Sequence, residues 1–178
     1  MASVKVLVTG GVRSGKSRHA EALLVGESTV TYVAPGPTTQ EDPDPDWVAR
    51  VAAHRERRPA SWTTRESRDL AAVLSLDGAV LVDCLGTWLS AVLDEADAWE
   101  RSSADAHALV TARLEPAVAA LSTAPGPVVL VTNEVGLGVV PAHRSGRLFR
   151  DLLGTVNQAF AVACDEVHLV VAGRVLVL

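Results

Sequence analysis

Cysteine is scarce in this sequence. Cys84 and Cys164 are the only two among 178 residues, and they lie far apart with no C-x-x-C pair. Structural zinc sites and disulfide frameworks need cysteines at characteristic spacings. The sequence therefore predicts neither kind of site. It indicates a reducing compartment, with both cysteines as small core residues.

Long apolar runs and targeting segments are also missing. No apolar run approaches the length that spans a membrane, and the N-terminal residues lack the basic-then-apolar layout of a signal peptide. We therefore expect a cytoplasmic protein with no membrane partner. The net charge of -5 argues against broad nucleic-acid binding, although it leaves room for a local basic patch.

Neither an internal repeat nor a linker-like tract interrupts the chain. Apolar residues make up 48% of the sequence and charged residues 21%, which is typical of a soluble globular protein. A chain of this length can bury a substantial core. We therefore predict that residues 1–178 form one domain.

Short apolar runs alternate with helix-like segments. The predicted strands are 4–9, 29–34, 79–83, 127–131 and 167–171, with a further strand at 175–178. The predicted helices are 17–24, 46–58, 68–74, 103–121 and 144–164, and Pro116 is expected to kink or divide the fourth. Apolar runs without polar alternation are typical of parallel strands buried on both faces. The order predicts an α/β fold, a P-loop NTPase-like open, mostly parallel sheet flanked by helices, with ligands beyond the carboxyl ends of the strands.

The most informative motif is a glycine-rich stretch from Gly10 to Ser17, with the sequence GGVRSGKS. It fits the phosphate-binding pattern G-x-x-x-x-G-K-[ST], between a predicted strand and a predicted helix. In such a loop, backbone N–H groups surround the phosphates, Lys16 reaches the outer ones from the solvent side, and the Ser17 hydroxyl ligates Mg²⁺. The motif therefore predicts a nucleoside triphosphate site.

Charged residues near this motif complete a candidate phosphoryl-transfer site. Asp83 ends an apolar strand, as the metal-binding acid of P-loop proteins does. Many strands end in an acid that only caps a turn, but next to a P-loop we favour the Mg²⁺ role. Arg13 inside the loop and Arg18 after it can stabilise negative charge, and Arg13 is the stronger candidate.

His54 lies on the predicted helix 46–58 and continues an apolar stripe with Trp47, Val48 and Val51. A histidine on such a stripe is usually a core residue, and position alone favours this interpretation. The alternative is a nucleophile, because neighbouring guanidinium groups disfavour the imidazolium and can clamp a triphosphate. These groups belong to Arg50, Arg55, Arg57 and Arg58.

Two other segments each allow two interpretations. The stretch from Pro35 to Asp46 contains four prolines and is either a solvated loop or a mobile flap beside the nucleotide. Thr132, Asn133 and Glu134 follow a predicted strand and either contact substrate or serve the structure, which we slightly favour. We assign no chemistry to the remaining histidines, His19, His107, His143 and His168.

Several stretches, taken in order, resemble one enzyme family. They are 7–18 (LVTGGVRSGKSR), 50–55 (RVAAHR), 82–85 (VDCL), 130–136 (LVTNEVG), 149–154 (FRDLLG) and 156–158 (VNQ). Over nearly its whole length the chain is similar to the bifunctional adenosylcobinamide kinase / adenosylcobinamide-phosphate guanylyltransferase family of cobalamin biosynthesis. This ordered set is far more specific than a P-loop, which many kinases share.

The resemblance implies a homotrimer that uses ATP or GTP with Mg²⁺ and acts on a corrinoid. One implied activity phosphorylates the hydroxyl of adenosylcobinamide, and the other transfers GMP from GTP to the resulting phosphate, giving adenosyl-GDP-cobinamide. The family's guanylylated histidine falls on His54, which overrides the core interpretation. Lys16 of the phosphate loop is the second catalytic candidate, because it contacts the phosphates.

The resemblance also implies a set of nucleotide contacts. They are Gly10, Gly11, Val12, Arg13, Ser14, Gly15, Lys16, Ser17, Ala34, Pro35, Gly36, Arg55, Glu56, Arg57, Arg58, Glu66 and Asp83. The family often has a hydroxyl-bearing residue after the alanine that ends the second strand. Here Pro35 and Gly36 follow Ala34, so we expect that side-chain contact to be lost while backbone contacts persist.

Two other classes of protein are compatible with the motifs. A different small-molecule P-loop kinase would transfer phosphoryl groups only and would form no covalent nucleotide adduct. A nucleotide-dependent switch would hydrolyse slowly, bind a protein partner and ignore corrinoids.

Overall fold

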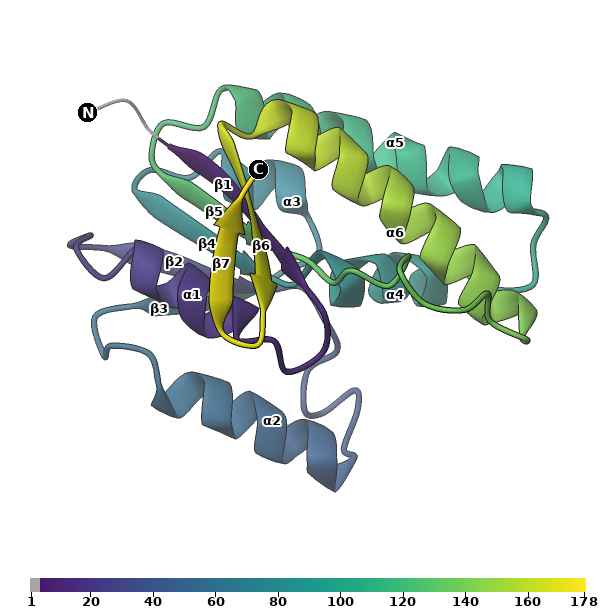
Figure 1. Cartoon of the computed structure of the whole chain (residues 1–178), viewed down its shortest axis with the longest axis horizontal. Coiled ribbons are helices and arrows are strands. Elements are labelled where there is room, and N and C mark those ends of the chain that lie inside the picture. Colours follow the sequence, from purple (N-terminus) through teal and green to yellow (C-terminus); the bar gives the residue numbers. More distant parts are fainter. Residues whose placement is uncertain (1–3) are drawn as a thin grey trace.

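Seven strands form one sheet in the computed structural model, which describes residues 4–178 (Figure 1). The strands are β1 (Lys5–Gly10), β2 (Val30–Ala34), β3 (Thr63–Glu66), β4 (Ala79–Asp83), β5 (Val128–Val131), β6 (Glu166–Val171) and β7 (Arg174–Val177). The helices are α1 (Lys16–Leu23), α2 (Pro45–Glu56), α3 (Leu70–Leu74), α4 (Leu85–Glu95), α5 (Ser103–Ser122) and α6 (Arg144–Ala163).

The sheet has the order β3-β2-β4-β5-β1-β6-β7. All neighbouring pairs are parallel except β6 and β7, which are antiparallel. The central strands are almost wholly buried, which explains why their sequences are continuous apolar runs. The predicted mostly parallel α/β sheet is confirmed.

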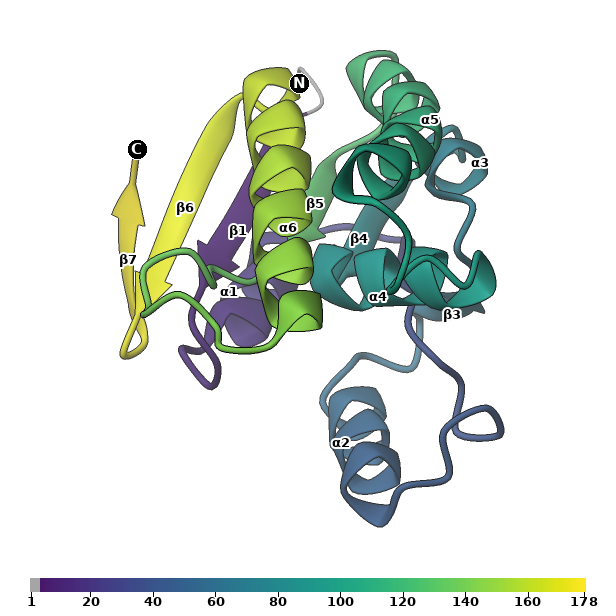
Figure 2. The same cartoon turned by 90° about the vertical axis from the view of Figure 1, so that its right-hand side faces the viewer.

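Helices cover both faces of the sheet (Figure 2). On β1, Val6 and Val8 pack with Ala20 of α1, whereas Leu7 points to the other face. There it joins a larger core with α3, α4, α5 and α6. Within residues 4–178, no helix combines the length and the apolar character needed to cross a membrane.

Two elements have no recognisable signal in the sequence. Strand β3 contains only exposed polar residues, and it forms because it pairs in parallel with β2 at the edge of the sheet. Helix α4 is buried over seven of its eleven residues. Because its apolar residues surround the axis instead of forming one stripe, the sequence lacks a clear helical period there.

Pro116 does not divide the fourth predicted helix. Helix α5 is twenty residues long and continues without a break past Pro116. A proline removes one backbone hydrogen bond, and the buried neighbours Leu114 and Ala117 keep the helix packed in the core with α3 and α6.

Helix α2 stands apart from the other helices in both views (Figures 1 and 2). The carboxylate of Asp44 caps its first turn, and Pro45 fits the first helical position. None of its residues is fully buried, but Trp47, Val51 and His54 of the predicted stripe are half-buried, and only Val48 is exposed. Trp47 and Val51 line a pocket, because this face of α2 borders the space between the helix and the sheet.

We predict that Gly126→Ala destabilises the fold without affecting ligand sites at the carboxyl ends of the strands. A Cβ atom on Gly126 would lie 2.1 Å from the backbone oxygen of Gly78, which cannot move aside like a side chain. The free energy of unfolding, measured in urea, should fall by about 1–3 kcal/mol. The control is Gly26→Ala, where a Cβ atom meets nothing within 4 Å. Equal stabilities of the two variants would show that the close approach of Gly126 to Gly78 does not constrain the fold.

Candidate functional site

The glycine-rich loop joins β1 to α1 and needs glycine at two positions. A Cβ atom on Gly10 would lie 2.4 Å from the backbone oxygen of Val170, and Gly15 has a φ of 98°, in the left-handed region. The Gly173 N–H donates to the Ser14 carbonyl at 2.8 Å and holds the loop against the β6–β7 turn. Arg13, with a φ of 55°, is exposed.

Lys16 is buried inside this loop, with 6% of its surface exposed, so its expected solvent-side position is wrong. Its Nζ donates to the Gly11 carbonyl at 3.1 Å, which folds the side chain back over the loop. Burial lowers the pKa of Lys16, although the neighbouring Cys84 and Asp83 oppose that shift. The ammonium group is therefore poorly hydrated, and a phosphate would be a stronger partner than the carbonyl.

Asp83 ends β4, and its side chain is only 8% exposed. The Tyr32 hydroxyl donates to Oδ2 at 3.1 Å, and His54 Nδ1 lies 3.6 Å from the same oxygen, too far for a good hydrogen bond. Burial alone raises the pKa of Asp83, but His54, Ser17 and Tyr32 outweigh it and hold that pKa below its usual value. The carboxylate therefore stays ionised.

Tyr32 is the neutral partner in this group. Burial raises the pKa of its hydroxyl far above the usual value, and the Asp83 carboxylate adds to that shift. The hydroxyl therefore remains a hydrogen-bond donor. Its ring lies under the guanidinium of Arg58, at 3.7 Å from Cζ to the ring centroid.

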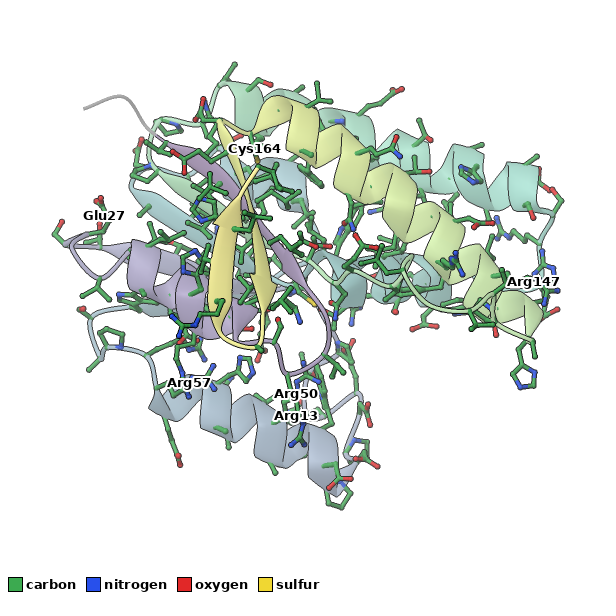
Figure 3. All side chains as sticks on the ribbon, viewed as in Figure 1. Arg13, Glu27, Arg50, Arg57, Arg147 and Cys164 are labelled. Carbon is green, nitrogen blue, oxygen red and sulfur yellow. The ribbon has the colours of Figure 1, made fainter. Side chains whose placement is uncertain are left out.

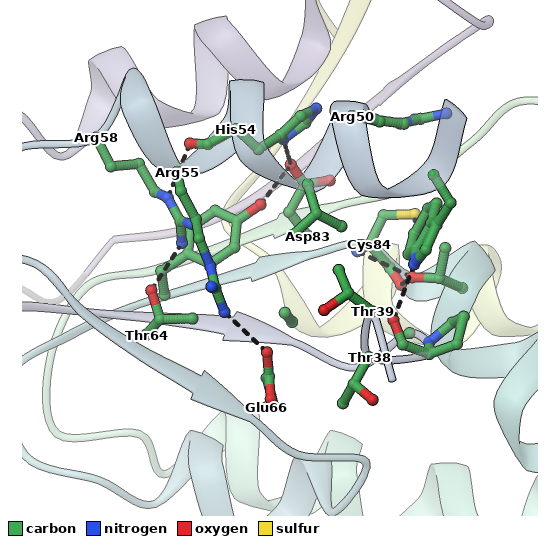
Figure 4. Close-up of a pocket in the computed structure, with 17 residues that line it drawn as sticks. Thr38, Thr39, Arg50, His54, Arg55, Arg58, Thr64, Glu66, Asp83 and Cys84 are labelled. Carbon is green, nitrogen blue, oxygen red and sulfur yellow. Dashed lines mark hydrogen bonds and ion pairs between the residues drawn. The ribbon is translucent and has the colours of Figure 1, made fainter. Parts of the chain in front are cut away.

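The arginines near His54 point in different directions (Figures 3 and 4). Arg58 donates to the His54 carbonyl at 2.9 Å, Arg55 pairs with Glu66 at 2.9 Å, and Arg57 pairs with Glu21 of α1 at 3.0 Å. The Arg55 and Arg57 pairs therefore fasten α2 to β3 and α1, whereas the Arg58 bond returns to the backbone of His54 itself. Arg50, Arg55 and Arg58 line the same pocket as His54, and only Arg57 of the predicted cluster does not, because the spacing along a helix does not reveal its partner Glu21.

A pocket lies between α2 and the carboxyl ends of β2, β3 and β4 (Figure 4). Of the residues predicted for the site, it contains Ala34, Gly36, His54, Arg55, Arg58, Glu66 and Asp83. The residues predicted for the site that do not line the pocket are Gly10 to Ser17, Pro35, Glu56 and Arg57. The structure therefore divides them between the phosphate loop and the pocket, and Ser17 of the loop helps to lower the pKa of Asp83 in the pocket.

The loop before α2 forms one wall of this pocket. Gly36, Pro37, Thr38 and Thr39 line it, and Trp47 Nε1 donates to the Pro37 carbonyl at 3.1 Å. Arg68 holds the loop further along, through an ion pair of 2.8 Å with Glu41. The first residues of this segment therefore lie beside the site, as the flap interpretation requires, and the mobility of the flap stays a prediction.

Sequence reasoning misses four pocket residues. They are Tyr32, Thr64, Cys84 and Thr87. Tyr32 lies two residues before the end of a predicted strand, where the carboxyl-end rule could have found it. Thr64 could not be found, because β3 has no apolar pattern. Cys84 and Thr87, expected only to pack, contact each other at the start of α4.

The segment after β5 has structural contacts. The Thr132 hydroxyl donates to Asn157 of α6 at 2.6 Å, and the Asn157 amide donates to the Asn133 carbonyl at 3.1 Å. The Glu134 carboxylate accepts from the Gly136 N–H at 2.8 Å. These bonds favour the structural interpretation of the three residues.

The sequence model of the cobinamide kinase / cobinamide phosphate guanyltransferase family matches residues 6–178. The chain belongs to this family. The resemblance based on the ordered motifs is thereby confirmed.

Similar proteins have names that agree with this membership. The bifunctional adenosylcobalamin biosynthesis proteins CobU of Salmonella typhimurium and of Escherichia coli are each 40% identical to the chain over 179 residues. Each alignment covers 94% of this chain and 96% of the relative. The bifunctional adenosylcobalamin biosynthesis protein CobP of Pseudomonas aeruginosa is 39% identical over 173 residues, covering 94% and 92%.

We predict that Lys16→Met weakens the binding of GTP and ATP by roughly tenfold or more, because a charge-assisted contact to phosphate is lost. Methionine fills the buried space of Lys16, so the fold should be retained. Titration calorimetry measures the affinity, and urea unfolding checks the fold. The control is Lys5→Met at the opposite end of β1, where the side-chain ammonium donates to the Ser122 carbonyl at 3.4 Å. Unchanged affinity in Lys16→Met would make Lys16 a structural residue of the loop.

Proposed function

We propose that the chain phosphorylates adenosylcobinamide with ATP or GTP and then transfers GMP from GTP to adenosylcobinamide phosphate, giving adenosyl-GDP-cobinamide. Its family membership supports both activities. The same membership counts against the two alternative classes, a simple kinase and a nucleotide-dependent switch.

The observation that carries the proposal for the transfer step is the approach of His54 to Asp83. His54 lies on α2, outside the core, and its Nδ1 lies 3.6 Å from the carboxylate that ends β4. Ser17, the last residue of the phosphate loop, is one of the groups that lower the pKa of Asp83, so the loop lies close to this carboxylate. A nucleotide held by that loop would therefore have an imidazole close to its phosphates.

In the transfer step, we infer that a neutral His54 nitrogen attacks the α-phosphorus of GTP. A phosphorus–nitrogen bond forms as the bond to the bridging oxygen breaks, and pyrophosphate leaves. A phosphate oxygen of the corrinoid then attacks the same phosphorus and releases His54. In the kinase step, the corrinoid hydroxyl attacks the γ-phosphorus directly, so that step needs no protein nucleophile.

The oxygen atoms of Ser17 and Asp83 suit Mg²⁺. Ser17 helps to lower the pKa of Asp83, and Mg²⁺ is commonly held by one carboxylate, a hydroxyl and substrate phosphates. When bound, Mg²⁺ neutralises charge on the phosphate oxygens. Asp83 supplies a full negative charge for this purpose because its pKa is held below the usual value.

We propose that both parts of the site, the phosphate loop and the pocket, contact the nucleotide. The loop from Gly10 to Ser17, with the ammonium of Lys16, would hold phosphates, and the pocket would take another part of the nucleotide against residues 34–36, 55–58 and 66. We further propose that residues 1–178 act as one domain, that the enzyme is a cytoplasmic homotrimer, and that its partner is a corrinoid.

Radiolabelled GTP tests this function. After incubation with GTP labelled at the α-phosphate and denaturation, the label should remain on the protein. Adenosylcobinamide phosphate added before denaturation should remove the label from the protein. A simple kinase or a switch would retain no label.

We predict that Asp83→Asn impairs the kinase step through a loss of Mg²⁺ affinity. Asparagine keeps the size of the side chain but removes the charge that holds a hard cation. The Mg²⁺ concentration for half-maximal rate should rise, and high Mg²⁺ should restore part of the rate. A Mg²⁺ requirement equal to that of the wild type would restrict Asp83 to a structural role.

We predict that His54→Asn abolishes guanylyl transfer and the covalent adduct, while a larger share of kinase activity remains. Only the first reaction uses a protein nucleophile. The adduct in the wild type should be a phosphoramidate, labile to acid and stable to alkali. Mass mapping should place GMP on the peptide that contains His54. GMP on another residue, or full transfer activity in the variant, would refute this assignment.

A further inference from the structure

We propose that Tyr32 is a positioning residue for guanylyl transfer, which orients His54 through two separate contacts. Its hydroxyl fixes Asp83, and its ring holds Arg58. The proposal rests on the proposed role of His54 as the nucleophile.

The hydroxyl contact fixes the carboxylate next to the imidazole. Tyr32 is 4% exposed on β2, which pairs with β4 so that Tyr32 aligns with Leu81, two residues before Asp83. Its hydroxyl donates to Asp83 Oδ2 at 3.1 Å, the same oxygen that lies 3.6 Å from His54 Nδ1. This bond limits rotation of the carboxylate and keeps Oδ2 directed at the ring.

The ring contact fixes the end of α2. Arg58 stacks on Tyr32 at 3.7 Å and donates to the His54 carbonyl at 2.9 Å and to the Thr64 hydroxyl at 3.1 Å. Because α2 has no fully buried residue, this helix depends on such polar contacts for its position. Tyr32 therefore supports both the backbone and the side chain of His54.

The arrangement determines which ring nitrogen can react. A carboxylate facing Nδ1 favours the tautomer with the proton on Nδ1. The lone pair then lies on Nε2, and Figure 4 shows the other ring nitrogen pointing away from Asp83. Nε2 forms the bond to the α-phosphorus as pyrophosphate leaves, and the Nδ1 proton stays in place next to Asp83.

Single-turnover formation of the labelled adduct tests the hydroxyl. In Tyr32→Phe the ring keeps its contact with Arg58, so the GTP concentration for half-maximal rate should stay within about twofold of the wild-type value. The maximal rate of adduct formation should fall roughly tenfold, as expected for a lost hydrogen bond to a charged group. A maximal rate within twofold of wild type overturns the proposal.

Tyr32→Leu tests the ring as well. This variant also loses the stacking on Arg58, so the maximal rate should fall below that of Tyr32→Phe. Equal rates in the two variants would overturn the role assigned to the ring. Urea unfolding of both variants shows whether the fold is kept, and Tyr32→Phe, which removes one atom, keeps the test valid if Tyr32→Leu does not fold.

A double-mutant cycle tests whether the hydroxyl acts through Asp83. In the Asp83→Ala background, Tyr32→Phe should cause no further loss of rate, whereas independent roles would give additive losses. Additive losses overturn the proposed route through Asp83. A wild-type enzyme that forms no adduct on His54 would instead refute the proposed function itself.

The ring nitrogens of His54 offer a readout that needs no nucleotide. Nitrogen-15 chemical shifts distinguish the two neutral tautomers, and the signal is assigned by its loss in His54→Asn. The wild type should carry the proton on Nδ1, and Tyr32→Phe should weaken that preference. A proton on Nε2 in the wild type overturns the proposal.

Discussion

A carboxylate that is almost completely buried at the end of β4 sets the requirements for the whole site. Asp83 cannot stay ionised there unless neighbouring groups replace the water it has lost. Three elements each supply such a group, and these groups are Tyr32 from β2, Ser17 from α1 and His54 from α2. The groups that stabilise the Asp83 carboxylate therefore come from the phosphate loop, from the pocket and from the helix that carries the candidate nucleophile.

Helix α2 is held in place by other interactions than the rest of the fold. The helices on the sheet are held by apolar burial, whereas α2 is held by polar contacts at its ends. The exposed pair of Arg55 and Glu66 contributes at most about 1 kcal/mol, because solvent screens it. The stacked Arg58, with two hydrogen bonds, is the more directional contact and therefore has the larger influence on where His54 lies.

The sequence predicts what depends on local pattern and misses what depends on partners. Parallel strands and the phosphate loop have patterns within a few consecutive residues, so both could be read directly. Strand β3 and the burial of Lys16 depend on neighbours distant in sequence, and α4 lacks a helical period because it is buried on several sides. For the same reason, Asp83 and His54 are separate candidates in the sequence, and only the fold shows them 3.6 Å apart.

The charges of Lys16 and Asp83 also depend on each other, which links the phosphate loop to the end of β4. Burial lowers the pKa of Lys16, and the nearby Asp83 charge acts against that shift. Asp83 in turn depends on His54 and Tyr32 to remain ionised. Because Lys16 and Asp83 both lie where solvent screening is weak, the positive and the negative charge stabilise each other. The residues proposed to hold phosphate and to bind Mg²⁺ are therefore electrostatically linked, because the Asp83 charge opposes the lowering of the Lys16 pKa.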